Sequence, residues 1–155
     1  MVAHIITRLA MGGAQQLVFE ITKRMKDSSK DVVIFTGESN ENSLSAQDNN
    51  ILKEVYKNNI RVELVSSLID KISLFHDLIA MYNICKLLKK YDPSIIHIHS
   101  SKTGILGRLA CKLMNKKNVI YHIHGWSFSR YEGIKKRFYF NLEKVFYHLT
   151  TKYIF

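Results

Sequence analysis

The sequence has little proline and little cysteine. In 155 residues it holds one proline, Pro93, and two cysteines, Cys85 and Cys111. Without Ser/Gly-rich segments, charge blocks or repeats, no linker is evident, and the length suits one domain core but not two. Both cysteines fall in segments with helical spacing, which favours small core residues in a reduced cytosolic protein over a disulfide or a metal pair.

Long apolar runs and two familiar glycine motifs are also lacking. No apolar run approaches the ~20 residues that a membrane-spanning helix needs. The dinucleotide fingerprint G-x-G-x-x-G and the phosphate-loop pattern G-x4-G-K-S/T are both absent. The sequence therefore indicates neither a membrane-spanning protein nor either of these nucleotide sites.

Acidic residues are scarce in the second half of the chain. Residues 1–85 hold nine Lys/Arg against ten Asp/Glu, whereas residues 86–155 hold fourteen against three, within a net charge of +10. A basic half attracts phosphates, whether on nucleic acid, on lipid headgroups or on a small ligand. Because no recognition helix or aromatic-bearing sheet surface is evident, we predict no nucleic-acid partner.

What the sequence does contain is a regular alternation of short apolar runs with helical patterns. Such alternation predicts a parallel sheet with right-handed crossovers. We predict a single α/β, Rossmann-like domain over residues 1–155, with a mostly parallel six-stranded sheet in the order 3-2-1-4-5-6 and helices on both faces. The predicted strands are residues 2–7, 31–36, 60–65, 95–99, 118–124 and 151–155, and the predicted helices are 14–25, 48–58, 74–91, 103–114 and 134–149, with a polar loop over 37–47.

The last predicted strand, residues 151–155, is apolar and has no helix after it. An unpaired apolar edge strand is a liability that proteins usually manage. The strand either closes the sheet or, as we expect, belongs to a longer polypeptide.

Three loops are expected to meet at the carboxyl edge of the sheet, where open α/β folds bind ligands. Gly12-Gly13 follows the first strand, residues 100–104 follow the fourth, and residues 125–130 follow the fifth. These three strands are neighbours in the predicted order. The sequence therefore predicts one ligand site built from all three loops.

The first two loops carry features that suit an anion. Gly12 and Gly13 leave backbone N–H groups at a helix N-terminus open to a ligand, although a tight strand-to-helix turn explains them too. Ser100 or Ser101 is expected to cap the next helix. Lys102 places a cation at the positive end of the helix dipole, and a bound phosphate or carboxylate would resolve that conflict.

Two histidine pairs repeat one pattern on adjacent strands. In His97-x-His99 and His122-x-His124, the period of two places both members of a pair on one face. We expect His97 and His122 to be packed, hydrogen-bonded core histidines. His99 stays open between packing and function, and His124 is interpreted as functional. No Asp, Glu or Cys flanks the pairs, so no metal site is predicted.

The segment after the fifth strand is rich in aromatic and basic residues. Trp126, on the same loop as Arg130, suits either stacking on a sugar or base or covering the core. The predicted helix 134–149 is both basic and aromatic. Such a helix either rests on an anionic membrane surface or packs its aromatics inward with its cations in water.

Taken together, three segments resemble the family 4 glycosyltransferases of the GT-B fold. The resemblance is to bacterial enzymes that build capsular, exopolysaccharide and O-antigen chains, and it extends over residues 2–155. The segments are VAHIITRLAMGGAQQ, HIHSSKTGILGR and YHIHGWSF.

The resemblance implies the first, acceptor-binding domain of a two-domain enzyme that retains anomeric configuration. A nucleotide-sugar would be its co-substrate, with no metal or other cofactor. His124 would contact the transferred sugar as the catalytic residue, and Gly12 and Gly13 would approach the donor diphosphate or the transferred sugar. Lys102, from its charge, is the candidate anion ligand beside them. The acceptor side of the cleft would comprise Gln16, His99, Ser100, Ser101, Gly125, Trp126 and Arg130.

The family's donor-binding domain, with its E-x7-E motif, is absent from this sequence. We therefore expect a truncated chain that is inactive alone and works with that domain in cis or as a second chain. We expect it in the cytoplasm, peripheral to the inner face of the membrane, near a lipid-linked acceptor. The alternative is a stand-alone, non-catalytic module that binds a nucleotide, a sugar phosphate or a lipid headgroup.

Overall fold

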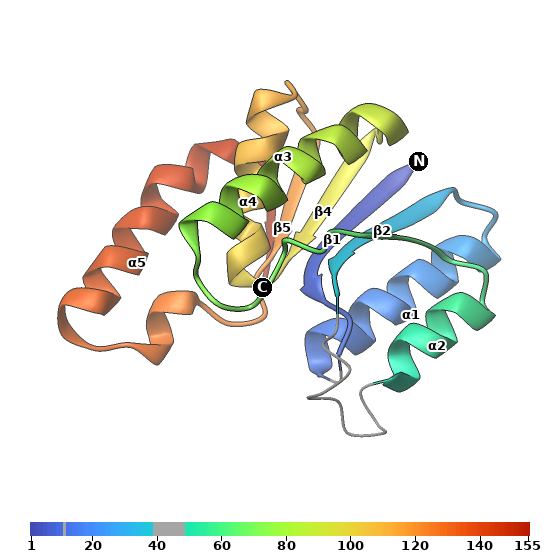
Figure 1. Ribbon diagram of the computed structural model, residues 1–155, viewed down its shortest axis with the longest axis horizontal. Helices are drawn as coiled ribbons and strands as arrows, with labels where there is room; N and C mark the ends of the chain where they lie inside the picture. The colour runs from blue at the N-terminus through green and yellow to red at the C-terminus, as the bar shows by residue number, and fades with distance from the viewer. Residues whose placement is uncertain (11, 39–48) are drawn as a thin grey trace.

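The computed structural model confirms the predicted six-stranded parallel sheet in the order β3-β2-β1-β4-β5-β6 (Figure 1). It describes residues 1–10, 12–38 and 49–155, without the side chains of residues 49, 50, 127 and 130. The strands are β1 (Val2–Arg8), β2 (Val32–Gly37), β3 (Arg61–Leu64), β4 (Ile95–His99), β5 (Val119–His122) and β6 (Lys152–Ile154). The helices are α1 (Gly13–Asp27), α2 (Asn49–Lys57), α3 (Leu74–Tyr91), α4 (Ser101–Leu113) and α5 (Gly133–Phe146), with 3₁₀ helices η2 (Ser127–Arg130) and η3 (Tyr147–Leu149).

Helices lie on both faces of the sheet. α1 and α2 cover one face on the side of β1, β2 and β3, while α3 and α4 cover the other face and α5 lies beyond α4 (Figure 1). Alternate residues of β1 follow this division: Ala3 and Ile5 join the core beneath α3 and α4, and Ile6 joins the core beneath α1 and α2. His4 shares the face of Ile6.

Two residues of helix α4 determine how it packs. Gly104 lets the helix approach β5, and Arg108 joins it to α5. A Cβ on Gly104 would lie 2.7 Å from the ring of Tyr121, so the glycine permits the close approach. Arg108 is fully buried beneath α5, where its Nη2 lies 2.6 Å from Oε2 of Glu143. Its guanidinium also lies over the Tyr121 ring, 4.5 Å from the centroid.

The predicted elements all exist, with changes at several ends. β5 ends at His122, two residues early, so His124 lies in the loop that follows. The predicted helix 134–149 is α5 followed by the short η3. Helix α3 ends at Tyr91, because Asp92 takes a left-handed conformation with φ of 42° and Pro93 follows.

The last predicted strand, residues 151–155, is β6 in the structure. β6 pairs with β5 in parallel, with Tyr121 opposite Tyr153, so the last strand forms one edge of the sheet. That this strand belongs to a longer polypeptide stays a prediction. The predicted polar loop 37–47 lies mostly outside the described residues.

Among the described helices, none combines the length and apolar character needed to cross a membrane.

Candidate functional site

Hydroxyl groups join the carboxyl ends of β1 and β4. The Oγ of Ser100 lies 2.6 Å from Oγ1 of Thr7 and 2.8 Å from Oγ1 of Thr103, and Thr103 donates to the carbonyl of His99. Ser100 is the residue before α4, but it makes no side-chain cap bond, so the predicted cap is wrong and its hydroxyl serves this network instead. Its φ of 65° is unusual for a residue with a side chain, as at many functional sites. Ser101 is the first residue of α4.

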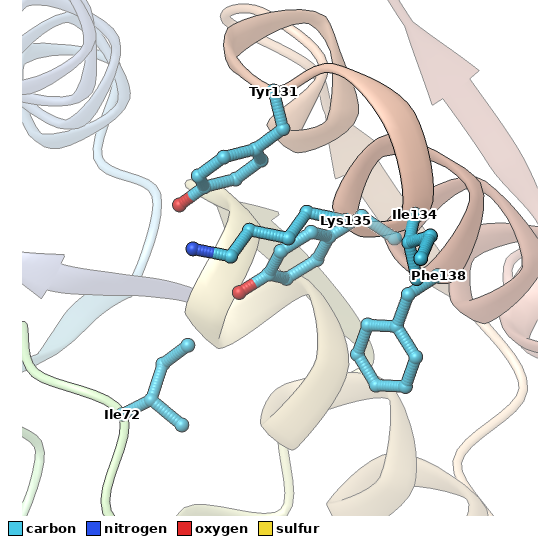
Figure 2. Close-up of a pocket in the computed structure, with 6 residues that line it drawn as sticks. Ile72, Tyr131, Ile134, Lys135 and Phe138 are labelled. Carbon is cyan, nitrogen blue, oxygen red and sulfur yellow. The ribbon is translucent and has the colours of Figure 1, made fainter.

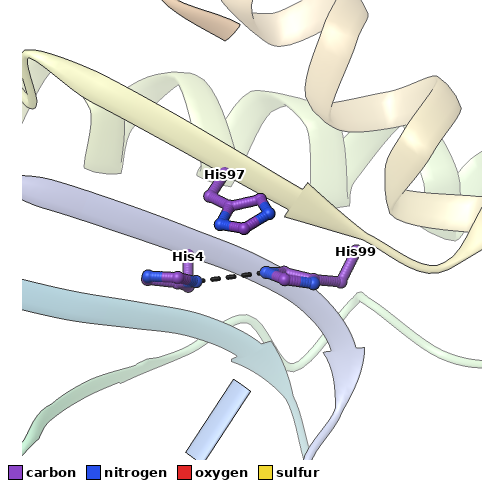
Figure 3. A group of neighbouring side chains, drawn as sticks. All are labelled: His4, His97 and His99. Carbon is purple, nitrogen blue, oxygen red and sulfur yellow. Dashed lines mark hydrogen bonds between the residues drawn. The ribbon is translucent and has the colours of Figure 1, made fainter. Parts of the chain in front are cut away.

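Five histidines form one layer on the face of the sheet that carries α1: His4, His97, His99, His122 and His124, here called the histidine layer. Strand register brings them together, because His4 pairs with His97 across β1 and β4, and His99 pairs with His122 across β4 and β5. Centroids of neighbouring rings lie 4.2 to 5.6 Å apart. Figure 3 shows His97 beside the hydrogen-bonded pair of His4 and His99.

Two hydrogen bonds run through this layer from the core to the edge. Nδ1 of His4 lies 3.1 Å from Nε2 of His99, and Nδ1 of His99 lies 3.1 Å from Nε2 of His124. His4 and His99 are fully buried, whereas His124 is exposed. The predicted functional histidine is therefore the outer member of a chain whose other members lie inside the protein.

Burial keeps the inner rings uncharged. It lowers the pKa of His4 to about 3, with a further contribution from His97, and it lowers the pKa of His97 to about 4. Burial also lowers the pKa of His99 well below its usual range, and those of His122 and His124 to a smaller extent. At neutral pH these are neutral imidazoles, and each has one N–H and one lone pair.

His97 and His122 were expected as packed, hydrogen-bonded core residues. His97 is buried as expected, but its Nε2 has no partner among the described residues. His122 is only half-buried, and its Nδ1 likewise lacks a partner in the described part of the chain. His99, which the sequence left open, is a buried residue with both ring nitrogens hydrogen-bonded.

Two trios in the layer have ring nitrogens close enough to share a metal ion. Within each, the ligand atoms lie within 4.8 Å of one another: His4, His97 and His99, and then His99, His122 and His124. Neutral imidazole is a good zinc ligand. In each trio, however, one pair of nitrogens already forms a hydrogen bond that the metal would have to replace. The geometry therefore favours a hydrogen-bonded layer over a metal centre.

Lys102 has partners within the chain. Its Nζ lies 2.6 Å from Oδ1 of Asp77 in the first turn of α3 and donates a 2.5 Å hydrogen bond to the carbonyl of Lys71. Asp77 thus supplies the negative charge that a bound phosphate or carboxylate was expected to supply. A role for Lys102 in binding an anion stays a prediction, but its argument from charge conflict no longer applies.

The glycine loop leaves space at the start of α1. A Cβ on Gly13 would meet nothing within 4 Å, and one on Gly12 would meet only the flexible side chain of Gln15. Gly12 has φ of 162°, which any residue adopts, so neither backbone strain nor packing demands these glycines. The interpretation as a tight turn therefore loses support. Gln16 is exposed and donates to Glu20.

The third loop closes over the core. Trp126 packs against the core beneath α3 and α4 and stacks on Phe128, with ring centroids 5.1 Å apart. Of the two interpretations, stacking on a ligand or covering the core, this contact supports the second. Gly125 has a positive φ of 139°, a conformation that favours glycine. Arg130 ends η2, and its side chain lies outside the described part of the structure.

Residues 11–155 match the sequence model of the family described as Glycosyltransferase Family 4. The chain is a member of glycosyltransferase family 4. The match includes every element described above except β1, and it confirms the family to which the three segments are similar, although the first segment lies only partly within it.

Relatives of this family 4 chain include O-antigen enzymes. It is 30% identical over 127 residues to the *Escherichia coli* UDP-Gal:alpha-D-GlcNAc-diphosphoundecaprenol alpha-1,3-galactosyltransferase, covering 82% of the chain and 30% of that enzyme. It is 29% identical over 149 residues to the *E. coli* O-antigen biosynthesis glycosyltransferase WbnH, covering 96% of the chain and 39% of the relative. The chain thus spans about a third of the length of these relatives.

Solved structures confirm the GT-B type of fold. MurG of Acinetobacter baumannii aligns with a TM-score of 0.64 at 12% identity, covering 98% of this chain and 40% of MurG. Anabaena Alr3699/HepE, solved with UDP and glucose, aligns with a TM-score of 0.63 at 15% identity, covering 92% of this chain and 35% of that protein. At this identity the likeness concerns the fold alone.

Proposed function

We propose that this family 4 chain is the acceptor-binding domain of a retaining glycosyltransferase. It would transfer a sugar from a nucleotide-sugar to a lipid-linked saccharide in cell-surface polysaccharide synthesis. The observation that carries this proposal is the hydrogen bond between His99 and His124 at the carboxyl edge of the sheet. The E. coli galactosyltransferase to which the chain is similar is named for a UDP-Gal donor and a diphosphoundecaprenol-linked acceptor, which supports these substrate classes.

The chemistry needs groups that stabilise a departing diphosphate in a closed site. His124 is exposed beside Gly125 and offers a ring nitrogen to a sugar hydroxyl or a phosphate oxygen. The open backbone at Gly13 offers N–H groups to the same class of ligand. Such a site needs preorganised groups on both sides, so we assign turnover to this chain together with a donor-binding domain, in cis or as a second chain.

A surface groove of about 530 Å³ suits a lipid-linked acceptor or the membrane itself. Figure 2 shows Ile72 facing Tyr131, which precedes α5, and Lys135 in the first turn of α5. Ile134 and Phe138 beside it are 89% and 61% exposed. Apolar groups and cations that share one surface bind the interface of an anionic bilayer. The groove supports our proposal that the chain binds a membrane surface, and we propose that this is the inner, cytoplasmic face of the membrane.

A transfer assay tests the proposal when the chain is joined to the donor-binding domain of the *E. coli* galactosyltransferase. With UDP-galactose and a diphosphate-linked N-acetylglucosamine lipid, His124→Ala should lower turnover by about 100-fold or more, the cost of losing one group that stabilises developing charge. His148→Ala is the matched control, because His148 is exposed in η3.

Undiminished turnover of His124→Ala would reject the catalytic assignment. Tight, saturable binding of UDP-galactose by the isolated 155 residues would instead favour a stand-alone binding module. Calorimetry on the unmodified chain measures that binding directly.

A further inference from the structure

The hydrogen-bonded series from His4 through His99 to His124 restricts where its hydrogens can lie. His99 uses both ring nitrogens, Nε2 toward His4 and Nδ1 toward His124. A neutral imidazole has one N–H and one lone pair, so His99 must donate one of these bonds and accept the other. Both bonds therefore point in the same direction along the series.

The two directions leave different groups at the ends. In the outward direction, Nδ1–H of His4 donates to His99, and Nδ1–H of His99 donates to His124. A lone pair then remains on Nε2 of His4, and an N–H on Nδ1 of His124. In the inward direction both hydrogens reverse, which leaves an N–H on Nε2 of His4 and a lone pair on Nδ1 of His124.

The inner end decides between these directions. Nε2 of His4 is buried and has no hydrogen-bond partner among the described residues. The inward direction would bury an N–H donor there with no acceptor, and orphaned buried N–H groups are rarer in proteins than under-satisfied acceptors. At the outer end His124 is exposed, so water or a ligand satisfies either form.

We infer that His4 and His99 are positioning residues that hold His124 in its Nδ1–H tautomer, so that His124 presents a hydrogen-bond donor at the edge of the sheet. The hydrogen bond made by one ring nitrogen sets the state of the other, and here that dependence extends through two rings. His4 thus acts on His124 without contacting it.

The chemical consequence concerns the class of ligand group that His124 meets. A fixed N–H is matched to an oxygen acceptor, such as a sugar hydroxyl or a diphosphate oxygen, and is unsuited to removing a proton. This part rests on the proposed function. The tautomer itself does not, because it follows from the chain's own hydrogen bonds.

The tautomer is measured on the uniformly ¹⁵N-labelled chain by long-range ¹H–¹⁵N correlation at pH 7 with a chelator present. The spectra assign the hydrogen of each ring to Nδ1 or Nε2. The Nδ1–H form of His124 should exceed the Nε2–H form by about tenfold or more, given the penalty for an unsatisfied buried donor. A dominant Nε2–H form, or the same averaging as at exposed His148, would overturn the inference.

Variants at position 4 test the action at a distance. Asparagine holds an amide N–H close to the place of Nδ1–H, so His4→Asn should preserve the tautomer of His124. His4→Asp replaces that donor with a carboxylate that can only accept a hydrogen bond from Nε2–H of His99. Both hydrogen bonds should then reverse, and the Nε2–H form of His124 should dominate. A dominant Nδ1–H form in a folded His4→Asp chain would overturn the positioning role.

The same logic at position 99 supplies a second pair of variants if His4→Asp does not fold. His99→Asn keeps a donor toward His124, whereas His99→Gln places its amide toward His4 instead. Only His99→Gln should release His124 from the Nδ1–H form. Equal spectra for the two variants would count against the inference.

The rate of sugar transfer distinguishes this inference from the proposed function, when it is measured on the joined enzyme, that is, this chain joined to the donor-binding domain of the E. coli galactosyltransferase. His124→Asn keeps an N–H near the place of Nδ1 and should retain about tenfold more turnover than His124→Gln, within the range for one donor. Equal losses in both variants would overturn the donor role. The proposed function would then still stand on the loss caused by His124→Ala.

Discussion

At the scale of single residues, the structure weakens the argument for a ligand at Lys102 and strengthens it at Gly13. Lys102 suggested an anion because of its place at a helix N-terminus, but Asp77, which is distant in sequence, lies 2.6 Å from it. Gly13 suited both a ligand-binding backbone and a tight turn, and the fold leaves its Cβ position empty. Sequence position shows which residues start a helix, whereas the space and charge around them depend on other elements.

Gly13→Ala provides a test that separates binding from stability. A methyl group there meets no atom within 4 Å, so the free energy of unfolding should stay unchanged or rise by up to about 1 kcal/mol. In the joined enzyme the KM for the nucleotide-sugar should rise by about tenfold, as expected for losing a hydrogen bond to a charged group. An unchanged KM would show that no ligand approaches this backbone.

The matched control for that variant is Gly104→Ala. Its methyl group would lie 2.7 Å from the ring of Tyr121, so it should destabilise the fold, by about 1–3 kcal/mol. Urea unfolding measures both variants.

At the scale of elements, a buried ion pair holds α5 against α4. Arg108 is fully buried and Glu143 is 7% exposed, with their closest atoms 2.6 Å apart. The guanidinium also donates to Phe146 O. The sequence shows Arg108 only as a member of a motif, because its partner is distant in the chain. Helix periodicity predicted both helices but not the charge pair between them.

Glu143→Gln should destabilise the chain by about 3–5 kcal/mol, because it leaves the charge of Arg108 buried without a counter-charge. Urea unfolding followed by circular dichroism measures this loss. The double variant Arg108→Met with Glu143→Leu should recover most of it, since a buried ion pair replaced by apolar groups is often neutral. A loss below about 1 kcal/mol in the single variant would contradict the assigned role.

At the scale of the whole molecule, the histidine layer makes stability depend on pH. The folded pKa of His4 is about 3 and that of His97 about 4, below the ordinary value of 6.5. Between those values the unfolded chain binds more protons than the folded chain. The stability contributed by the neutral rings is therefore complete above pH 6.5 and is lost as pH falls.

Between pH 6.5 and 4.5 the free energy of unfolding should fall by up to about 1.4 kcal/mol per pH unit for each deeply shifted histidine. Unfolding by urea at several pH values measures the slope. His4→Asn should reduce it by the share of one histidine, while His148→Gln should leave it unchanged. A flat profile over this range would contradict neutral, buried rings in the folded chain.

The groove beside α5 makes a second prediction at this scale. Ile134→Ser with Phe138→Ser should weaken binding to vesicles containing phosphatidylglycerol by at least about tenfold, because two apolar side chains no longer enter the interface. Leu113→Ser is the matched control, since Leu113 is exposed at the end of α4. Co-sedimentation measures binding, and equal weakening by both changes would argue against the groove.

The sequence by itself determined the strands, the helices and their order in the sheet. This was possible because hydrophobic periodicity and the handedness of crossovers are local rules. It also indicated His124 and the glycine loop, and through motifs the family. Tertiary structure alone decided that His4 joins His99 and that Asp77 faces Lys102. Strand register and helix docking are set by packing between residues far apart in the chain, so no single segment encodes these contacts.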